Sequence, residues 1–213
     1  MSTDLESLYQ QVILDHARKR SGFGLSDDAV ARHHELNPTC GDEITVGIAV
    51  DADGAISTLG WEGQGCSISM ASASTMSELC ADRDTQEVRG LIADFRAMLR
   101  NRDGDEPPEA LEDAVAFQGV SRFVMRIKCA MLGWVALEAC LDQIAAQDAS
   151  AQRALAADKA INDRRVGLEL HVSVQAIDEH ASDTRPLVGA AGFLLDDRGQ
   201  HEEFRRALDR QPG

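Results

Sequence analysis

The stretch ITVGIAVDADGAISTLGW, residues 44–61, contains the clearest structural signal in the chain. Residues 44–50 are rich in β-branched and small side chains, as strands usually are. Asp53-Gly54 is a dipeptide typical of tight hairpin turns. We therefore expect a second strand over residues 55–61, paired antiparallel with the first.

Further elements are predicted on both sides of this hairpin. Towards the N-terminus, residues 30–36 indicate a third strand, and residues 5–16 repeat apolar positions at helical spacing. Towards the C-terminus, the pattern predicts helices over residues 67–81 and 85–101, and a short one over 111–117. The last helix carries its apolar stripe on Ile127, Met131, Trp134, Leu137, Leu141 and Ile144. Strands grouped before helices predict an α+β fold, a small three-stranded antiparallel sheet with helices packed on one face.

Composition excludes several classes of function. No stretch approaches the ~20 apolar residues of a membrane-spanning helix, so we expect no membrane partner. The beginning of the chain is polar and acidic, unlike a secretory signal, which favours the cytoplasm. The formal net charge of −15 argues against nucleic acid as a partner, since phosphate binding requires a basic surface.

The predicted domain covers residues 1–145, and residues 146–213 form a C-terminal extension of unknown role. Residues 151–161 have helical composition, and residues 166–174 alternate as a strand would. Apolar residues also gather at 188–195 and 204–208. This content is high for a disordered tail, so we expect the extension to dock on the domain or on a partner, away from the metal-binding turn.

Helical rise separates the five cysteines into two groups. Cys80 follows Cys66 by 14 residues, or ~21 Å along one helix, and Cys140 follows Cys129 by 11, or ~16 Å. Zn–S bonds are ~2.3 Å long, so neither pair can share an ion. Cys80 and Cys140 are therefore predicted to be small buried residues.

The other three cysteines each have a reason to ionise. Cys40 lies in the turn NPTCGD, residues 37–42, two positions before Asp42. Cys66 begins a helix, where the helix dipole favours a thiolate, and Cys129 lies near Arg126 and Lys128. Three thiolates and Asp42 would complete a four-coordinate zinc site. Spacing alone leaves three buried structural cysteines as an equal alternative, because the chain has no CxxC motif.

Four segments resemble one known family. They are LYQQVILDH (8–16), NPTCGD (37–42), GQGCSISMASAS (63–74) and the pair GVSRF (119–123) and RIKCAMLGW (126–134). Together they resemble the SufU family, which is similar in fold to the IscU iron–sulfur scaffolds, over residues 5 to about 145. Lys128 stands where scaffolds have a histidine ligand, and the segment between Cys66 and Cys129 is long. Both features favour the SufU family over the IscU scaffolds.

The resemblance implies a zinc site formed by Cys40, Asp42, Cys66 and Cys129. It also implies that Cys40 accepts sulfur from a PLP-dependent cysteine desulfurase and passes it to a downstream iron–sulfur assembly scaffold. Two alternatives remain: a scaffold on which an iron–sulfur cluster is itself assembled, and a binding module with a purely structural zinc. Arg126 is expected either to support the site or docking, or to form a solvated salt bridge. His16 continues an apolar stripe and is expected to be a packed residue.

Overall fold

The computed structural model describes residues 2–101 and 106–181. Its elements, in chain order, are α1 (Ser2–Lys19), β1 (Ala31–Leu36), β2 (Glu43–Val50), β3 (Ile56–Gln64), α2 (Ser67–Cys80), α3 (Thr85–Arg100), the 3₁₀ helix η1 (Glu109–Arg122) and α4 (Val124–Ala181).

The three strands form the predicted antiparallel sheet in the order β1-β2-β3. Ala31 pairs with Ile48 at one end of β1 and Leu36 with Glu43 at the other. β3 continues three residues beyond its predicted end, because residues 62–64 pair with residues 43–45. The pairing of Glu43 with Gln64 brings the two loops that follow β1 and β3 to the same end of the sheet.

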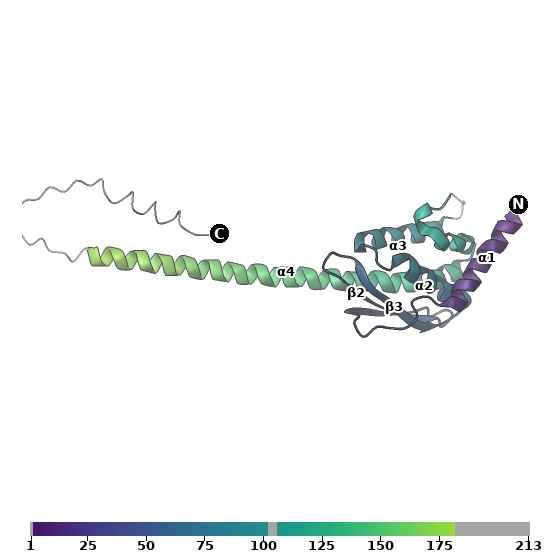
Figure 1. Cartoon of the computed structure of the whole chain (residues 1–213), viewed down its shortest axis with the longest axis horizontal. Helices are drawn as coiled ribbons and strands as arrows, with labels where there is room; N and C mark the ends of the chain where they lie inside the picture. Colours follow the sequence, from purple (N-terminus) through teal and green to yellow (C-terminus); the bar gives the residue numbers. More distant parts are fainter. Residues whose placement is uncertain (1, 102–105, 182–213) are drawn as a thin grey trace, which may run out of the picture. The chain divides into compact units, whose positions relative to one another are not determined.

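The core lies between the sheet and the helices, which gather on one side of the strands in Figure 1. Alternate residues of β2 are fully buried, and the middle of the predicted stripe of α4, from Met131 to Leu141, is buried as well. The Trp134 ring stacks on Phe95 of α3, with 4.4 Å between ring centroids. The predicted α+β class, with its small antiparallel sheet, is confirmed.

α2 packs through hydroxyl groups as much as through apolar side chains. Ser69, Ser72, Ser74, Thr75 and Ser77 are all buried. The Ser72 hydroxyl donates to the Ala130 carbonyl of α4 (2.6 Å) and accepts from the Trp134 indole N–H (3.0 Å). Small side chains on α2 let α4 approach closely, since a Cβ at Gly133 would lie 3.5 Å from Ala73.

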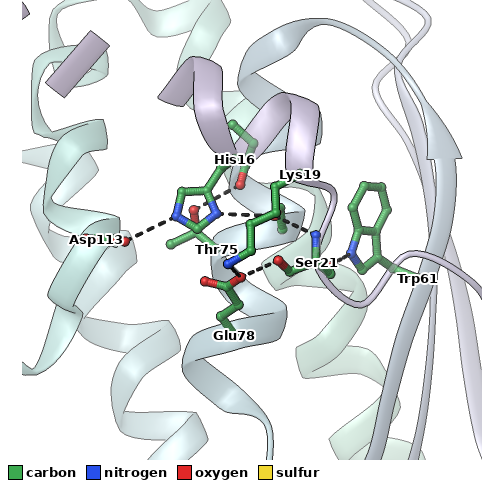
Figure 2. Close-up of polar contacts among 9 residues, drawn as sticks. His16, Lys19, Ser21, Trp61, Thr75, Glu78 and Asp113 are labelled. Carbon is green, nitrogen blue, oxygen red and sulfur yellow. Dashed lines mark hydrogen bonds and ion pairs between the residues drawn. The ribbon is translucent and has the colours of Figure 1, made fainter. Parts of the chain in front are cut away.

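Buried His16 connects α1 to two other elements, as Figure 2 shows. Its Nδ1 lies 3.2 Å from the Ser74 hydroxyl of α2, and its Nε2 lies 3.3 Å from an Asp113 carboxylate oxygen of η1. Ser21, just past α1, donates its backbone N–H to Ser74 (2.9 Å) and accepts from the Trp61 indole at its carbonyl (2.8 Å). His16 is thus a packed residue, as predicted.

Two helical segments differ from the prediction. The short helix expected over residues 111–117 is a longer 3₁₀ helix, interrupted at Glu112 by a φ of +45°. The strand expected over residues 166–174 is wrong, because α4 continues through Ala181. Residues 146–181 contain no proline and a single glycine, so nothing interrupts the helix. A helix also satisfies its own backbone hydrogen bonds, whereas an isolated strand does not.

The chain divides at Ala157, and residues Met1–Ala157 form a compact unit that contains all the elements before α4. The apolar stretches expected at residues 188–195 and 204–208 lie outside the described residues. Within residues 2–101 and 106–181, no helix combines the length and apolarity needed to cross a membrane.

Candidate metal centre

The loop between β1 and β2 carries the first two predicted ligands. The Asn37 N–H donates to the Asp42 carbonyl (2.8 Å), and the Gly41 N–H donates to the Asn37 carbonyl (2.9 Å). Gly41 has a φ of +76°, a left-handed conformation that glycine adopts without strain. This closed turn holds Cys40 and Asp42 on either side of Gly41.

α4 brings the third predicted ligand to this turn. Cys129 lies in the second turn of the helix, and its Sγ is 3.5 Å from the Sγ of Cys40. Ligand atoms of Cys40, Asp42 and Cys129 all lie within 4.8 Å of one another. Two thiolates on one tetrahedral zinc would be about 3.8 Å apart, given Zn–S bonds of about 2.3 Å. Both the spacing and the chemistry of these donors therefore fit zinc.

Cys66, the fourth predicted ligand, lies beside this group rather than within it. It occupies the N-cap position of α2, where its side chain makes no capping hydrogen bond. Its Sγ is 3.5 Å from the Ser69 hydroxyl, which donates to the Asp42 carboxylate (2.8 Å). The structure thus brings three of the four predicted residues together and places the fourth next to them, in contact with Ser69 and Asp42.

Ser69 and Gly65 support Asp42, although the sequence analysis gave neither a role. The Ser69 hydroxyl donates to one carboxylate oxygen of Asp42 and so orients this carboxylate. A Cβ at Gly65 would lie 2.7 Å from both the Asp42 Cγ and the Ser69 Oγ, so only glycine fits there. The signal for Ser69 was its position three residues after Cys66, which places both on one helical face.

Asn37 is a further buried residue that the sequence analysis left without a role. Its side-chain amide lies 3.5 Å from the Cys129 Sγ, in a geometry that lets the N–H donate to the sulfur. Its side-chain oxygen accepts from the Thr39 N–H (3.1 Å). An asparagine directly before proline in a turn is the signal that could have found it. Asn37 therefore connects the loop of Cys40 to the helix of Cys129.

The electrostatics of the cluster favour a bound cation. Burial works to raise the pKa of Asp42, but hydrogen bonds from Ser69, Cys66, Cys129 and Cys40 outweigh it and hold this pKa below its ordinary value. Burial raises the pKa of the Cys129 thiol, and its neighbours Cys40 and Asp42 raise it further. A second negative charge beside Asp42 is thus unfavourable until a cation compensates for it.

Cys80 and Cys140 are buried away from the cluster, as predicted. Burial raises the pKa of Cys80 to about 12 and that of Cys140 to about 11, so both remain thiols. The Cys140 thiol donates to the Val46 carbonyl (3.4 Å).

Arg126 and Lys128 are exposed on the first turns of α4. The Arg126 guanidinium lies over the Phe123 ring, 4.8 Å from its centroid. Neither cation has an ion-pair partner among the residues that the structure describes, so the salt bridge considered for Arg126 is not formed within them.

The fold and the site together define a class: a small α+β domain with a candidate metal site of cysteine and aspartate side chains at the end of a three-stranded sheet. Comparison with known families gives the particular one. The sequence model of the NifU-like N terminal domain matches residues 8–151, and the chain belongs to this family.

Named relatives agree with this family. The chain is 39% identical over 137 residues to the zinc-dependent sulfurtransferase SufU of Bacillus subtilis, covering 64% of this chain and 91% of that protein. It is 34% identical to the iron-sulfur cluster assembly scaffold protein IscU of Thermotoga maritima, covering 64% and 94%. A crystal structure of a putative iron-sulfur cluster assembly scaffold protein for the SUF system, from Fervidobacterium islandicum, superposes with a TM-score of 0.57 at 30% identity, covering 62% and 94%. The resemblance to SufU and IscU proteins is thereby confirmed.

Proposed function

We propose that this protein is a zinc-dependent sulfur acceptor in iron–sulfur cluster assembly. The observation that carries the proposal is the convergence of Cys40, Asp42 and Cys129, with Cys40 alone of the three exposed to solvent. An exposed cysteine on a loop can meet a partner's persulfide, while a buried one on a helix can hold a metal. Relatives named as a zinc-dependent sulfurtransferase and as assembly scaffolds support the proposal.

Cys40 is the acceptor in this proposal, and Asp42, Cys66 and Cys129 are the other ligands. Zinc would keep the coordinated cysteines as thiolates at neutral pH. The Cys40 thiolate attacks the outer sulfur of a persulfide on a PLP-dependent cysteine desulfurase. A new S–S bond forms on Cys40, the S–S bond of the donor breaks, and the donor cysteine leaves as a thiolate that takes up a proton. A downstream assembly scaffold then receives the sulfur.

Other residues hold this arrangement in place. Ser69 orients the Asp42 carboxylate, and Asn37 donates to Cys129. The Gly41 turn presents Cys40 at the surface, while Asp42 and Cys129 stay buried. Arg126, exposed beside the cluster, is proposed to support docking of the donor.

The scaffold alternative rests on the relatives named IscU, and the structure offers one observation against it. Lys128, which stands at the position of the scaffold's histidine, is exposed, and a lysine is not among the usual metal ligands. A purely structural zinc is less suited to a site whose Cys40 is open to solvent.

Two measurements on the purified full chain test the proposal, with the Cys40→Ala variant as comparison. Elemental analysis should find about one zinc per wild-type chain. The wild type should accelerate alanine release from cysteine by a SUF-type desulfurase, and Cys40→Ala should not. Iron with a visible cluster spectrum and little zinc would favour the scaffold. Full stimulation by Cys40→Ala would show that Cys40 is not the acceptor.

A further inference from the structure

An open cavity of about 330 Å³ lies beside the metal centre. Its walls come from α1, the start of α2, the end of η1 and the start of α4, and they include Tyr9, Ile13, Ile68, Val120 and Phe123. A closed apolar cavity of about 150 Å³ already accommodates a benzene molecule. This cavity therefore has room for one bulky side chain with part of its backbone, but it lies at the low end of the range for small-molecule sites.

The cavity adjoins the cysteines that hold the candidate metal. Ser67 and Ile68, which follow Cys66 directly, line one side. Phe123 and Arg126 line another, and Arg126 precedes Cys129 by less than one helical turn. A protein segment that reached exposed Cys40 would thus pass close to the cavity.

The surface around the cavity combines apolar residues with positively charged ones. Phe123, Val124 and Met125 are three consecutive apolar residues, each about half exposed at 51%, 54% and 50%. Such a run is unusual on a surface that is not an interface.

Arg126 lines the cavity, and Arg122 directly precedes Phe123, which also lines it. Both cations are exposed, and neither forms an ion pair with another residue that the structure describes. Glu6 is the one carboxylate in the described lining, whereas the chain as a whole carries a formal charge of −15. Complementarity of charge therefore selects a partner segment that carries carboxylates.

We propose that this cavity is the docking pocket for the sulfur donor. Its occupant is a segment of the desulfurase that inserts one bulky apolar side chain and places a carboxylate near Arg126. The inference rests on the proposed function, and it adds where the donor is held and which chemistry recognises it. The pocket contributes to association, while the transfer itself takes place at Cys40.

Gly119 allows the pocket to be filled without disturbing the fold. It lines the cavity, and a Cβ there would meet nothing within 4 Å. Gly90 on α3 has the same open surroundings and does not line the cavity, so Gly90→Trp is a matched control. Each variant adds the same side chain to the full chain.

Gly119→Trp should weaken binding to a purified SUF-type desulfurase by about tenfold or more, the loss expected when one buried apolar side chain is excluded. The half-saturating concentration for stimulating alanine release should rise in parallel. Zinc content and the rate of sulfur transfer to Cys40 from a small-molecule persulfide should stay at the wild-type values. Gly90→Trp should match the wild type in every measurement.

Wild-type binding by Gly119→Trp would overturn the docking pocket and leave the sulfur-acceptor function standing. A change in oligomeric state, measured by sedimentation, with desulfurase binding unchanged would also overturn it and assign the pocket to contact between copies of the chain. If the wild type accepts no sulfur even from the small-molecule persulfide, the proposed function itself fails, and the docking proposal fails with it.

Discussion

Ser69 shows how a residue outside the predicted ligand set can determine the geometry of a predicted ligand. Its hydroxyl donates to one oxygen of Asp42 and lies 3.5 Å from the Cys66 sulfur. Removing a residue that orients a metal ligand typically costs about 10–100-fold in metal affinity.

We therefore expect Ser69→Ala to weaken zinc binding by about tenfold or more while the domain stays folded. Ser67→Ala is the matched control, since Ser67 lies in the same helical turn, is exposed and has no hydrogen bond to Asp42. Competition with a chromophoric chelator measures the affinity, and circular dichroism checks the fold. Equal affinities of the two variants would show that Asp42 needs no support from Ser69.

The predicted ligands could be proposed from the sequence more easily than the residues that support them. Cys40, Asp42 and Cys129 were predicted from motif and residue type, because thiols and carboxylates are the groups that zinc selects. Ser69 and Asn37 carry no such chemical signature. Their roles depend on distances across the fold, from the β1–β2 loop to α2 and to α4. Sequence spacing likewise could not show that Cys66 lies beside the group of Cys40, Asp42 and Cys129 rather than within it.

At the level of elements, a polar cluster around the ionisable Glu78 holds α1 to α2. Lys19 and Ser21 both bond to the Glu78 carboxylate, as Figure 2 shows. Burial works to raise the pKa of Glu78, but the bonds from Lys19 and Ser21 outweigh it and lower this pKa from its ordinary value of 4.5. The folded state therefore binds a proton at Glu78 less readily than the unfolded state does.

The lowered pKa of Glu78 predicts how the effect of Glu78→Gln on stability depends on pH. A lowered pKa in the folded state stabilises the protein above the unfolded pKa, and this contribution disappears as the pH falls through the folded value. Glu78→Gln should thus lower the free energy of unfolding at pH 7 by roughly 0.2–1 kcal/mol, the range for a partly exposed ion pair. The difference from wild type should shrink below about pH 4.5.

Urea unfolding at a series of pH values measures this difference. Glu87→Gln is a control, since Glu87 is an exposed acid on α3 that forms no ion pair with any described residue. A constant difference between wild type and Glu78→Gln from pH 7 to pH 3 would contradict the prediction.

The sequence predicted helices and strands correctly where the hydrophobic pattern was long or ended at a clear turn signal. β2 and β3 were found because Asp53-Gly54 fixes the hairpin. The end of β3 was missed because residues 62–64 have the composition of a loop, and only their pairing with β2 makes them a strand. The false strand at residues 166–174 arose for the opposite reason. Its residues alternate as in a strand, but they lie within a continuous helix, in which the backbone N–H and C=O groups already have hydrogen-bond partners.

For the molecule as a whole, we propose that residues 146–213 serve association rather than metal binding. The predicted ligands all lie before residue 130, and the buried apolar residues that the structure describes run from Ala31 to Leu141. Residues 145–162 are exposed. The described core and the predicted ligands therefore all lie within the unit that ends at Ala157.

Deleting residues 158–213 should leave zinc content unchanged and the midpoint of thermal unfolding within about 2 °C of that of the full chain. Differences are expected instead in oligomeric state or in partner binding, measured by sedimentation. Loss of zinc from a truncated chain that still folds would place the extension at the metal centre and refute the proposal.

The hydroxyl-lined α2 has a consequence for how this protein can vary. In most cores an apolar side chain can be exchanged for another of similar volume at little cost, so sequences drift by such exchanges. Here an apolar side chain larger than serine in place of Ser72 or Ser74 would push neighbouring helices apart and leave the Trp134 indole or the Ser21 backbone N–H without an acceptor. Divergence at these two positions is confined to small residues with a hydroxyl, and an engineer who wanted a more stable variant would do better to begin elsewhere.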